Sequence, residues 1–585
     1  NVTFNQPFSG RGLNKEGAGV LLLKTANTDT SGENDVTVSQ GILRVGINNV
    51  FGTRARVAAM TGDGVLDLNG FSVEVSTLEN IEPTTEIRLG SGQLTVRTGG
   101  ATYGAITGTG GVVIGKSGFS PASCTFGGVN TFSGGITVAF GGQLTLQNAA
   151  GLGAPGNPLT LDNGSLSTGS LMASPLVMDS SMNLIIGPGG ARFSAGGQSI
   201  IINSLLSGTN PIRFGGGSSP SESSVYDVRL ANPANTFTGP VQIGQADSNN
   251  TASGIIGIVA NGSLGNAANV VTLGGRYFDG ESNRTSSGGL RAYADLTIPA
   301  TRAILIEGES AVLDSNGHTF TIASPISELS PGIGMRKEGE GTLILNGAST
   351  YTGETYVRRG VLGGNGSVGG RLVMDWDGTL APGAPGGVGT FTCADLDFSG
   401  GGTYAVNLAS GSGSDLLVSN GEVSISPAAV LVIQPTGPVT QGDVFTILQK
   451  SGSTPVDGTF QQTGTFSSGG VEWSINYAGG DGNDITLTAL SGSTAAPVVP
   501  KLSNLVITPA GAAGSGTFAG ISATISGGQA NGSVLLEAST DLGVLDPWEV
   551  IRTIPLDASG AATITNATDP NSSGARRNFF RLRVP

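Results

Sequence analysis

The chain has few of the residues on which catalysis and metal binding commonly depend. Its 585 residues include one histidine and two cysteines. A Ser-His-Asp triad could use only His318 as its base, and its Asn-Gly-His setting is typical of an exposed turn. One histidine and two distant cysteines, Cys124 and Cys393, cannot supply a tetrahedral zinc set. We therefore expect no enzyme, no cofactor and two free, buried thiols.

Basic stripes and long apolar runs are also missing. Charged residues make up 12% of the chain, and the net charge is −14. Without a basic stripe to neutralise phosphates, we expect no nucleic-acid partner. No run of about 18 apolar residues is present, so we expect no membrane-spanning helix. The sequence starts with Asn1 rather than Met, and we expect export through a cleaved signal peptide to the cell surface or the medium.

Glycine is abundant, at 98 residues, and it accompanies many Val, Ile, Leu and Thr residues. This composition fits short strands joined by tight turns, because glycine readily adopts positive φ angles. Alternating and short apolar runs are common, and no long window has helical periodicity. The composition and these patterns predict an all-β protein.

One short cassette occurs four times: an apolar strand, a Thr-aromatic-Ser/Thr-Gly turn, and further strands divided by a glycine. The fullest copy spans residues 337–362 and opens with Lys-Glu-Gly, as does a looser copy at residues 15–45. Shorter versions, both starting Asn-Thr-Phe, occupy residues 130–138 and 235–243. A unit of this size cannot bury its apolar side alone, so stacking on its neighbours is the physical solution. The repeats predict a β-solenoid.

The composition and the strand pattern of the sequence change near residue 490. We predict a solenoid over residues 1–490, beginning with a strand at 1–9, and an extended proline-containing linker at 491–502. About seven short strands then follow within residues 503–585, a spacing that predicts a small antiparallel β-sandwich.

The cassette resembles the autotransporter-associated β-strand repeat of bacterial passenger domains. Residues 378–383, 441–448 and 477–484 resemble the closing section of such passengers. This resemblance implies a right-handed parallel β-helix displayed outside the cell. We expect that the residues after the solenoid do not form the translocator of an autotransporter. Release or retention by another route is then expected, with proteolytic loss of a translocator as the alternative.

Two pairs of carboxylates are weak candidates for a functional site. Asp375 and Asp377 flank Trp376, and strand alternation predicts that both carboxylates lie on one face, where they could bind a sugar or calcium or act as acid and base. Asp481 and Asp484 lie in a Gly-Gly-Asp-Gly-Asn-Asp run that is close to a calcium-binding repeat. A single copy cannot complete a calcium shell, so a tight turn is favoured there.

Assembly is the function that the sequence favours: a structural subunit of a bacterial filament, sheath or surface layer, with itself as head-to-tail partner. Open solenoid ends recruit further strands, and a contact that does not close builds a filament. The expected assembly residues are apolar at the N-terminus and basic near the C-terminus: Val2, Phe4, Phe8, Arg576, Arg577, Arg581 and Arg583.

A cell-surface adhesin is the alternative function. In that hypothesis the solenoid is a stalk, surface glycans are the partners, and an insertion within residues 210–300 forms the binding face. A carbohydrate-active enzyme is the third hypothesis, and the small number of candidate catalytic residues argues against it.

Overall fold

The computed structural model describes most of the chain: residues 1–6, 12–28, 34–52, 55–80, 82–215, 227–246, 251–278, 280–411, 413–493, 501–509, 518–526, 533–539, 549–557, 561–567 and 579–583. These residues form β-strands and two short 3-10 helices, η1 (Ala149–Leu152) and η2 (Asn261–Leu264). Within this part of the chain, no helix has the length and apolarity needed to cross a membrane. The predicted all-β class is confirmed.

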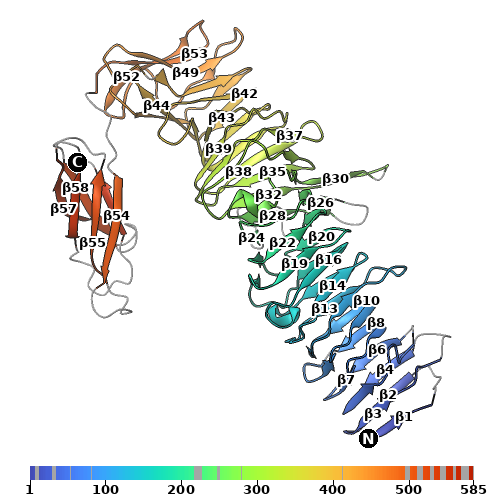
Figure 1. The fold of residues 1–585 in the computed structure, drawn as a ribbon. Helices are drawn as coiled ribbons and strands as arrows, with labels where there is room; N and C mark the ends of the chain where they lie inside the picture. The colour runs from blue at the N-terminus through green and yellow to red at the C-terminus, as the bar shows by residue number, and fades with distance from the viewer. Residues whose placement is uncertain are drawn as a thin grey trace.

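Strands one turn apart pair in parallel throughout the first sheet. Its strands, in spatial order, are β1 (Val2–Phe4), β3 (Val20–Leu23), β5 (Ile42–Val45), β7 (Val65–Asp67), β9 (Glu86–Arg88) and β11 (Ala105–Thr107). Residues at the same position on successive turns are Val2, Leu21, Leu43, Leu66, Ile87 and Ile106. Figure 1 shows this stacking continuing along one long axis. The predicted parallel β-solenoid is confirmed, and it has about 17 turns.

The second sheet runs beside the first and divides in two, because β10 is long enough to pair with both β12 and β13. Its strands are β2 (Gly12–Lys15), β4 (Asn34–Val38), β6 (Ala55–Met60), β8 (Val73–Asn80), β10 (Leu94–Thr102), β12 (Val112–Ile114), β13 (Ser123–Phe126), β14 (Ile136–Ala139), β15 (Gln143–Leu146), β16 (Leu159–Asp162), β17 (Gly164–Thr168), β19 (Asn183–Ile186), β20 (Ala191–Ser194), β22 (Leu205–Gly208), β23 (Ile212–Phe214), β25 (Val241–Ile243), β29 (Val271–Leu273), β34 (Ile304–Ile306) and β37 (Ile326–Glu328).

The third sheet carries the later turns. Its strands are β18 (Leu176–Met178), β21 (Ile200–Ile202), β24 (Val228–Leu230), β28 (Gly254–Ile258), β32 (Gly288–Ala292), β33 (Leu296–Ile298), β35 (Ser310–Asp314), β36 (Thr319–Ile322), β38 (Gly334–Glu338), β39 (Thr342–Leu345), β40 (Thr355–Gly364), β41 (Leu372–Pro382), β43 (Leu396–Gly400), β44 (Thr403–Ala409), β45 (Gly413–Ser414), β47 (Val423–Ile425), β48 (Val430–Pro435) and β50 (Asp457–Gly458).

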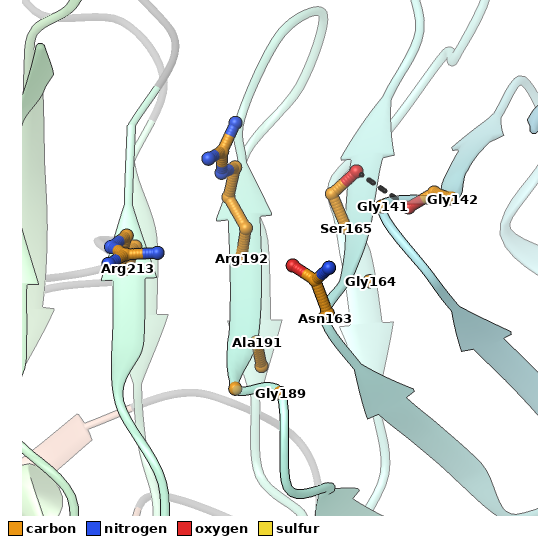
Figure 2. Close-up of a pocket in the computed structure, with 10 residues that line it drawn as sticks. Gly141, Gly142, Asn163, Gly164, Ser165, Gly189, Ala191, Arg192 and Arg213 are labelled. Carbon is orange, nitrogen blue, oxygen red and sulfur yellow. Dashed lines mark hydrogen bonds between the residues drawn. The ribbon is translucent and has the colours of Figure 1, made fainter. Parts of the chain in front are cut away.

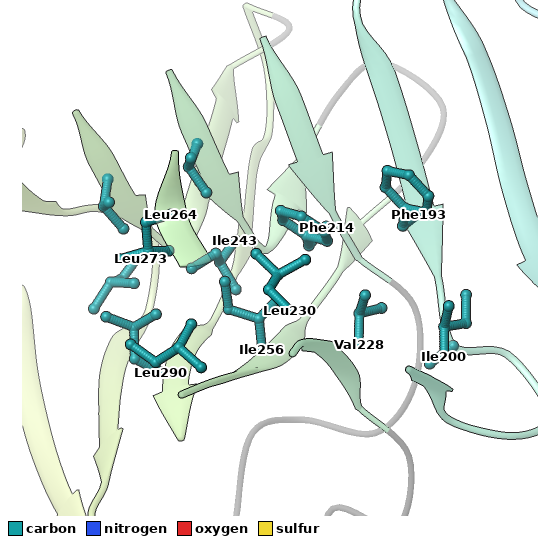
Figure 3. Close-up of a cluster of buried hydrophobic side chains, with 14 of the residues drawn as sticks. Phe193, Ile200, Phe214, Val228, Leu230, Ile243, Ile256, Leu264, Leu273 and Leu290 are labelled. Atoms are coloured by element: carbon teal, nitrogen blue, oxygen red, sulfur yellow. The ribbon is translucent and has the colours of Figure 1, made fainter. Parts of the chain in front are cut away.

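The core consists of rows of apolar side chains, one from each turn. Parallel register places like residues above one another, so each row is buried by the turns on either side. The rings of Phe193 and Phe214 stack in one row with their centroids 5.7 Å apart. Two of these rows are drawn together in Figure 3: Phe193, Phe214, Ile243 and Leu273 from the second sheet, and Ile200, Val228, Ile256 and Leu290 from the third.

A buried lysine holds the turn of the fullest cassette. The Lys337 side chain is inaccessible to solvent, and its ammonium donates hydrogen bonds to the carbonyl oxygens of Glu338, Gly339 and Arg359 and to Ser315 Oγ. An ammonium has three protons and no acceptor, so a cage of oxygens satisfies it completely. Because Arg359 and Ser315 belong to the turns on either side, the lysine joins three turns.

The first cassette repeats this arrangement. Lys15 is 6% exposed, and its ammonium donates to the carbonyl oxygens of Glu16, Gly17 and Gln40. The bonds therefore go to the same two positions of the Lys-Glu-Gly motif and to the next turn. The repeated Lys-Glu-Gly is explained by this cage, which the sequence analysis did not foresee.

The glycine after each cage accommodates a close approach between turns. Gly360 has a φ of 65°, and a Cβ atom there would lie 2.5 Å from the carbonyl oxygen of Gly341. Gly41 has a φ of 66°, and its Cβ would lie 2.5 Å from the oxygen of Gly17. Only glycine combines this backbone conformation with the absence of a side chain.

Buried asparagines link the two shorter cassettes to neighbouring turns through side-chain hydrogen bonds. Asn130 Oδ1 accepts the N–H of Ile106 at 2.9 Å, and its Nδ2 donates to the carbonyl of Gly151 at 2.8 Å. These partners lie on the preceding and following turns. Asn235 makes the equivalent pair of bonds to Leu206 and Ser263.

The sheet that closes the solenoid combines parallel and antiparallel pairing. The sheet order is β42 (Thr390–Cys393), β46 (Leu416–Ser419), β49 (Val444–Lys450), β53 (Asp484–Ala489), β52 (Val471–Gly479) and β51 (Thr465–Ser468). Pairing is parallel as far as β49 and antiparallel beyond it. Trp473 is fully buried in this part of the core, and its indole N–H donates to the carbonyl of Ser468.

The last described strands form two antiparallel sheets, β54 (Lys501–Pro509), β55 (Phe518–Ser526) and β58 (Ala562–Ala567), and β57 (Glu549–Pro555), β56 (Ser533–Ser539) and β59 (Phe579–Arg583). One buried cluster draws side chains from both sheets, among them Ile525, Ile564, Leu536 and Ile554. The boundaries of this domain stay a prediction.

Lys337→Met should open the cassette turn. The change leaves several buried carbonyls without a donor, which we expect to lower the local opening free energy of β38 to β40 by about 3 kcal/mol. Amide hydrogen exchange across these strands measures it. Lys24 is exposed, and Lys24→Met serves as the control with little expected effect. Equal protection in both variants would show that the cage is not stabilising.

Gly360→Ala should destabilise the same turn, and Gly386→Ala provides a matched comparison. Gly386 has a φ of 73° but no atom within 4 Å of a Cβ built there. Both alanines incur about 1 kcal/mol of left-handed backbone strain, so the excess loss at Gly360 measures the clash between turns. Thermal unfolding of the two variants should differ; equal melting temperatures would contradict the close approach.

Candidate ligand-binding face

Polar side chains cover the outward side of five successive strands, β35, β38, β40, β41 and β43. The register aligns Arg336, Tyr356, Val373 and Asp397 in one outward row. Strand alternation sends the intervening residues into the core, where Val357 is fully buried. We call this outward surface the charged face.

Ion pairs join neighbouring turns on the charged face and beside it, on β32. Arg291 Nε lies 2.6 Å from Asp314 Oδ2, and both side chains are nearly buried. Further along, Arg358 lies between two acids, 4.0 Å from Glu338 and 3.7 Å from Asp375. Because each turn stands directly above the last, opposite charges at equal positions become cross-strand pairs.

A groove of about 640 Å³ opens where β38, β40 and β41 begin. The Tyr356 hydroxyl donates to the Glu354 carboxylate, and this hydrogen bond, with burial, raises the pKa of Tyr356. Arg371 is 3.9 Å from Glu354. Charged donors and acceptors beside an aromatic ring suit a polyhydroxylated ligand. The polar and aromatic groups of its lining are Glu309, Arg336, Glu354, Tyr356, Arg371 and Asp395.

Two hairpins interrupt the solenoid next to this groove. They are β26 (Gln245–Ala246) with β27 (Thr251–Ala252), and β30 (Gly275–Phe278) with β31 (Asn283–Ser286). Thr285 Oγ1 donates to Glu309, which lines the groove, at 3.1 Å. Figure 1 shows β30 extending away from the stacked turns, and Phe278 on it is 60% exposed. Both hairpins fall within residues 210–300, where the sequence predicts an insertion.

Trp376 is the most exposed large apolar side chain among the described residues, at 80%. It lies at a β-bulge: Val357 pairs with Met374, but two residues later Arg359 pairs with Asp377. The extra residue on β41 interrupts the alternation on which the shared-face prediction for Asp375 and Asp377 rests.

Each of the two predicted carboxylates has its own arginine partner. Asp375 lies 3.7 Å from Arg358, and Asp377 lies 3.9 Å from Arg359. All four side chains are substantially exposed. The two carboxylates that flank Trp376 in the sequence are thus held in separate ion pairs.

The sequence analysis missed the groove residues Glu354, Tyr356 and Arg371. Glu354 and Tyr356 lie on one turn and Arg371 on the next, so the three become neighbours only when the cassette is aligned with the following turn. The change of sign from turn to turn, Glu338, Arg358 and then Asp375, is the signal that points to this part of the sheet.

The second predicted carboxylate pair belongs to a hairpin. Asp481 lies in the turn between β52 and β53, and Asp484 opens β53. Asp484 Oδ1 accepts the backbone N–H of Lys450 at 3.0 Å. In the part of the chain that the structure describes, no three His, Cys, Asp or Glu side chains are grouped as metal ligands.

The histidine and the cysteines occupy ordinary structural positions. His318 is 37% exposed in its turn, with Nδ1 3.6 Å from Asp295 Oδ1. Cys124 and Cys393 are free and buried, as predicted. Burial raises the pKa of each thiol to about 12, which makes both cysteines unreactive.

The predicted assembly residues are only partly described. Val2 and Phe4 on β1 are 57% and 43% exposed. Arg581 Nε lies 2.7 Å from the buried carboxylate of Glu537, and Arg583 pairs through its backbone within the same sheet. Their role in assembly stays a prediction. Phe8, Arg576 and Arg577 lie outside the described residues.

The fold and the charged face together define a parallel β-solenoid with a polar groove on one sheet. The passenger-associated-transport-repeat family matches residues 13–45 and 335–362, which are the two cassettes with caged lysines. The resemblance to autotransporter passenger repeats is therefore confirmed.

Two curated relatives show how far the likeness extends. The adhesin BmaC autotransporter of Brucella suis is 27% identical over 366 residues, which cover 59% of this chain and 10% of that protein. An extracellular serine protease of Serratia marcescens is 32% identical over 186 residues, or 26% of this chain and 17% of the relative. The chain thus spans less than a fifth of either relative.

Among solved structures, the Hap adhesin of Haemophilus influenzae is similar over 83% of this chain and 59% of its own. The two share 14% sequence identity, and the TM-score is 0.32.

Asp314→Asn should destabilise the charged face far more than Asp377→Asn. The first change leaves the nearly buried Arg291 without its anion and should cost about 3 kcal/mol. The second breaks an exposed pair and should cost roughly 0.5 kcal/mol or less. Chemical denaturation, followed by hydrogen exchange in β32 and β35, measures both. Similar losses would show that burial does not set the strength of these pairs.

Proposed function

We propose that this chain acts outside the cell as an adhesin-like binding protein. Two passenger-associated-transport-repeats and the likeness to an adhesin autotransporter support surface export and adhesion. These relatives support the adhesin alternative in preference to the filament subunit that the sequence favours. Export through a cleaved signal peptide stays a prediction.

The charged face is the proposed binding surface, and a glycan is the proposed ligand class. The observation that carries this proposal is Trp376, which is 80% exposed and whose two sequence neighbours, Asp375 and Asp377, each pair with an arginine. An exposed indole offers an apolar face, and the ion pairs offer donors and acceptors. The groove lined by Tyr356 and Arg371 offers a further aromatic ring and further charged groups along the solenoid.

A binding role also fits the solenoid itself. Stacked turns hold the strands of the charged face at a fixed spacing of about 4.8 Å, so a ligand meets a preformed surface. The serine protease relatives share only a fraction of their length with this chain, and we propose no catalysis for the described face.

Trp376→Ala should weaken binding to immobilised oligosaccharides by roughly 30-fold, the effect of about 2 kcal/mol that removing a central aromatic produces. The full chain, fluorescently labelled, would be applied to a printed array of neutral and acidic oligosaccharides and to epithelial cells. The control, Leu171→Ala, removes another exposed apolar side chain, at 66%, from a distant part of the solenoid.

The control variant should bind as the wild type does. If Trp376→Ala retains full binding, the charged face is not the ligand site. If the wild type binds neither the array nor the cells, the adhesin proposal is wrong.

A further inference from the structure

Phe140 has a backbone conformation that aromatic residues rarely adopt. It lies at the corner between β14 and β15, with a φ of 54°. Any side chain with a Cβ is strained in this left-handed region, and asparagine tolerates it better than an aromatic residue does. The other non-glycine residues that the structure describes with a positive φ are all asparagines, namely Asn49, Asn69, Asn163 and Asn316. The sequence thus keeps a phenylalanine where an asparagine would fit with less strain.

Packing of the corner does not explain this phenylalanine. Phe140 is 50% exposed, and its backbone N–H donates to the carbonyl of Asp162 at 3.2 Å. The N–H of Gly141 donates to the carbonyl of Asn163 at 2.6 Å, so both bonds to the next turn are independent of the side chain at position 140. On that turn the corner between β16 and β17 is formed by Asn163, with a φ of 53°. Backbone strain that places a side chain in solvent is a mark of a functional position.

A second exposed aromatic residue lies on the corner of the preceding turn. Phe119 belongs to the loop between β12 and β13 and is 44% exposed. The Arg97 guanidinium lies over its ring, 4.6 Å from the centroid, and holds the ring in place. The two corners are in contact, because a Cβ atom built at Gly141 would lie 3.2 Å from Pro121 Cγ. Two exposed rings therefore stand on adjacent corners of the second sheet.

The cations beside these rings are held in ion pairs. Arg97 Nε lies 3.2 Å from one carboxylate oxygen of Glu74, and Lys116, on the same loop as Phe119, pairs with the other oxygen. These pairs fix the loop to the turns before it. The groups that remain for a ligand at the two corners are the aromatic rings, which favour an uncharged partner with apolar faces.

Neutral polar groups border the Phe140 corner on the following turn. Asn163 and Ser165 line a notch of about 90 Å³, which Gly141 also lines. Figure 2 shows both side chains beside Gly141, with the hydrogen bond from Ser165 Oγ to the Gly142 carbonyl. This volume corresponds to about three water molecules, so it admits a hydroxyl or hydroxymethyl group and excludes a whole sugar ring. The exposed Asn163 amide can both donate and accept hydrogen bonds.

We propose that these corners bind a neutral glycan, with the apolar faces of its sugar rings against Phe140 and Phe119 and its hydroxyl groups at Asn163 and Ser165. An aromatic face suits the C–H face of a pyranose ring because both are apolar, and a few polar groups fix the orientation. The site lies on the second sheet, whereas Trp376 lies on β41 of the third. The chain therefore carries a glycan site in addition to the charged face.

The test uses soluble cellohexaose, maltohexaose and chitohexaose with the full chain carrying Trp376→Ala, so that the charged face does not contribute. We expect at least one hexasaccharide to bind in isothermal titration calorimetry. Adding Phe140→Asn should weaken this binding about tenfold or more, whereas Phe140→Trp keeps an aromatic ring and should stay within about threefold. The control Val177→Ala alters another apolar residue, 52% exposed on β18, and should leave the affinity unchanged.

Thermal unfolding separates a binding role from a structural one. Asparagine adopts the left-handed conformation with less strain, so Phe140→Asn should keep or raise the melting temperature while binding is lost. A lower melting temperature would show that the ring stabilises the corner and would overturn the proposal. Unchanged affinity in Phe140→Asn would overturn it as well, as would a Trp376→Ala chain that binds none of the three hexasaccharides.

Failure of this site and failure of the charged face give different results. If Trp376→Ala binds the hexasaccharides as tightly as the wild type does and Phe140→Asn abolishes that binding, the corners are supported and the charged face is not a glycan site. If Trp376→Ala abolishes all binding by itself, the charged face is supported and the corner site is refuted.

Discussion

The in-register parallel pairing of one turn with the next is the constraint on which this structure depends. A single turn has unpaired backbone groups on both edges and an apolar row that it cannot cover. The turn above and the turn below satisfy both requirements at once. Register is therefore critical, since a slip of one residue would exchange core and surface positions along a strand.

Polar side chains inside the solenoid enforce this register at its corners. The Lys337 cage joins three turns, and Asn130 and Asn235 bond to the turns on both sides. A buried ammonium or amide is costly unless every donor is satisfied, so these groups tolerate only one alignment of the turns. Apolar rows alone would fix the register less strictly, because Leu, Ile and Val can replace one another with little loss of stability.

The same register also creates the surface chemistry. On the charged face, alternation of sign between turns produces the pairs Arg291–Asp314 and Arg358–Asp375. On the second sheet, repetition of one sign produces the Arg192–Arg213 pair. In a solenoid, residues at one position on successive turns lie side by side and form a continuous strip. Strips of different composition therefore give chemically different surfaces on the same solenoid.

Composition and the repeated cassette were enough to determine the all-β class and the stacking of turns, because these follow from local patterns that recur once per turn. The parallel pairing was implied by the resemblance to passenger repeats, and the free thiols by the distance between the two cysteines. The sequence also located Asp375, Trp376 and Asp377. It could not show their environment, since a bulge in β41 altered the alternation. The lysine cages and the groove at Tyr356 were decided by tertiary structure alone. Each needs at least one partner from a neighbouring turn, such as Arg359 for Lys337 and Arg371 for Glu354, and these residues meet only when one turn is set on another.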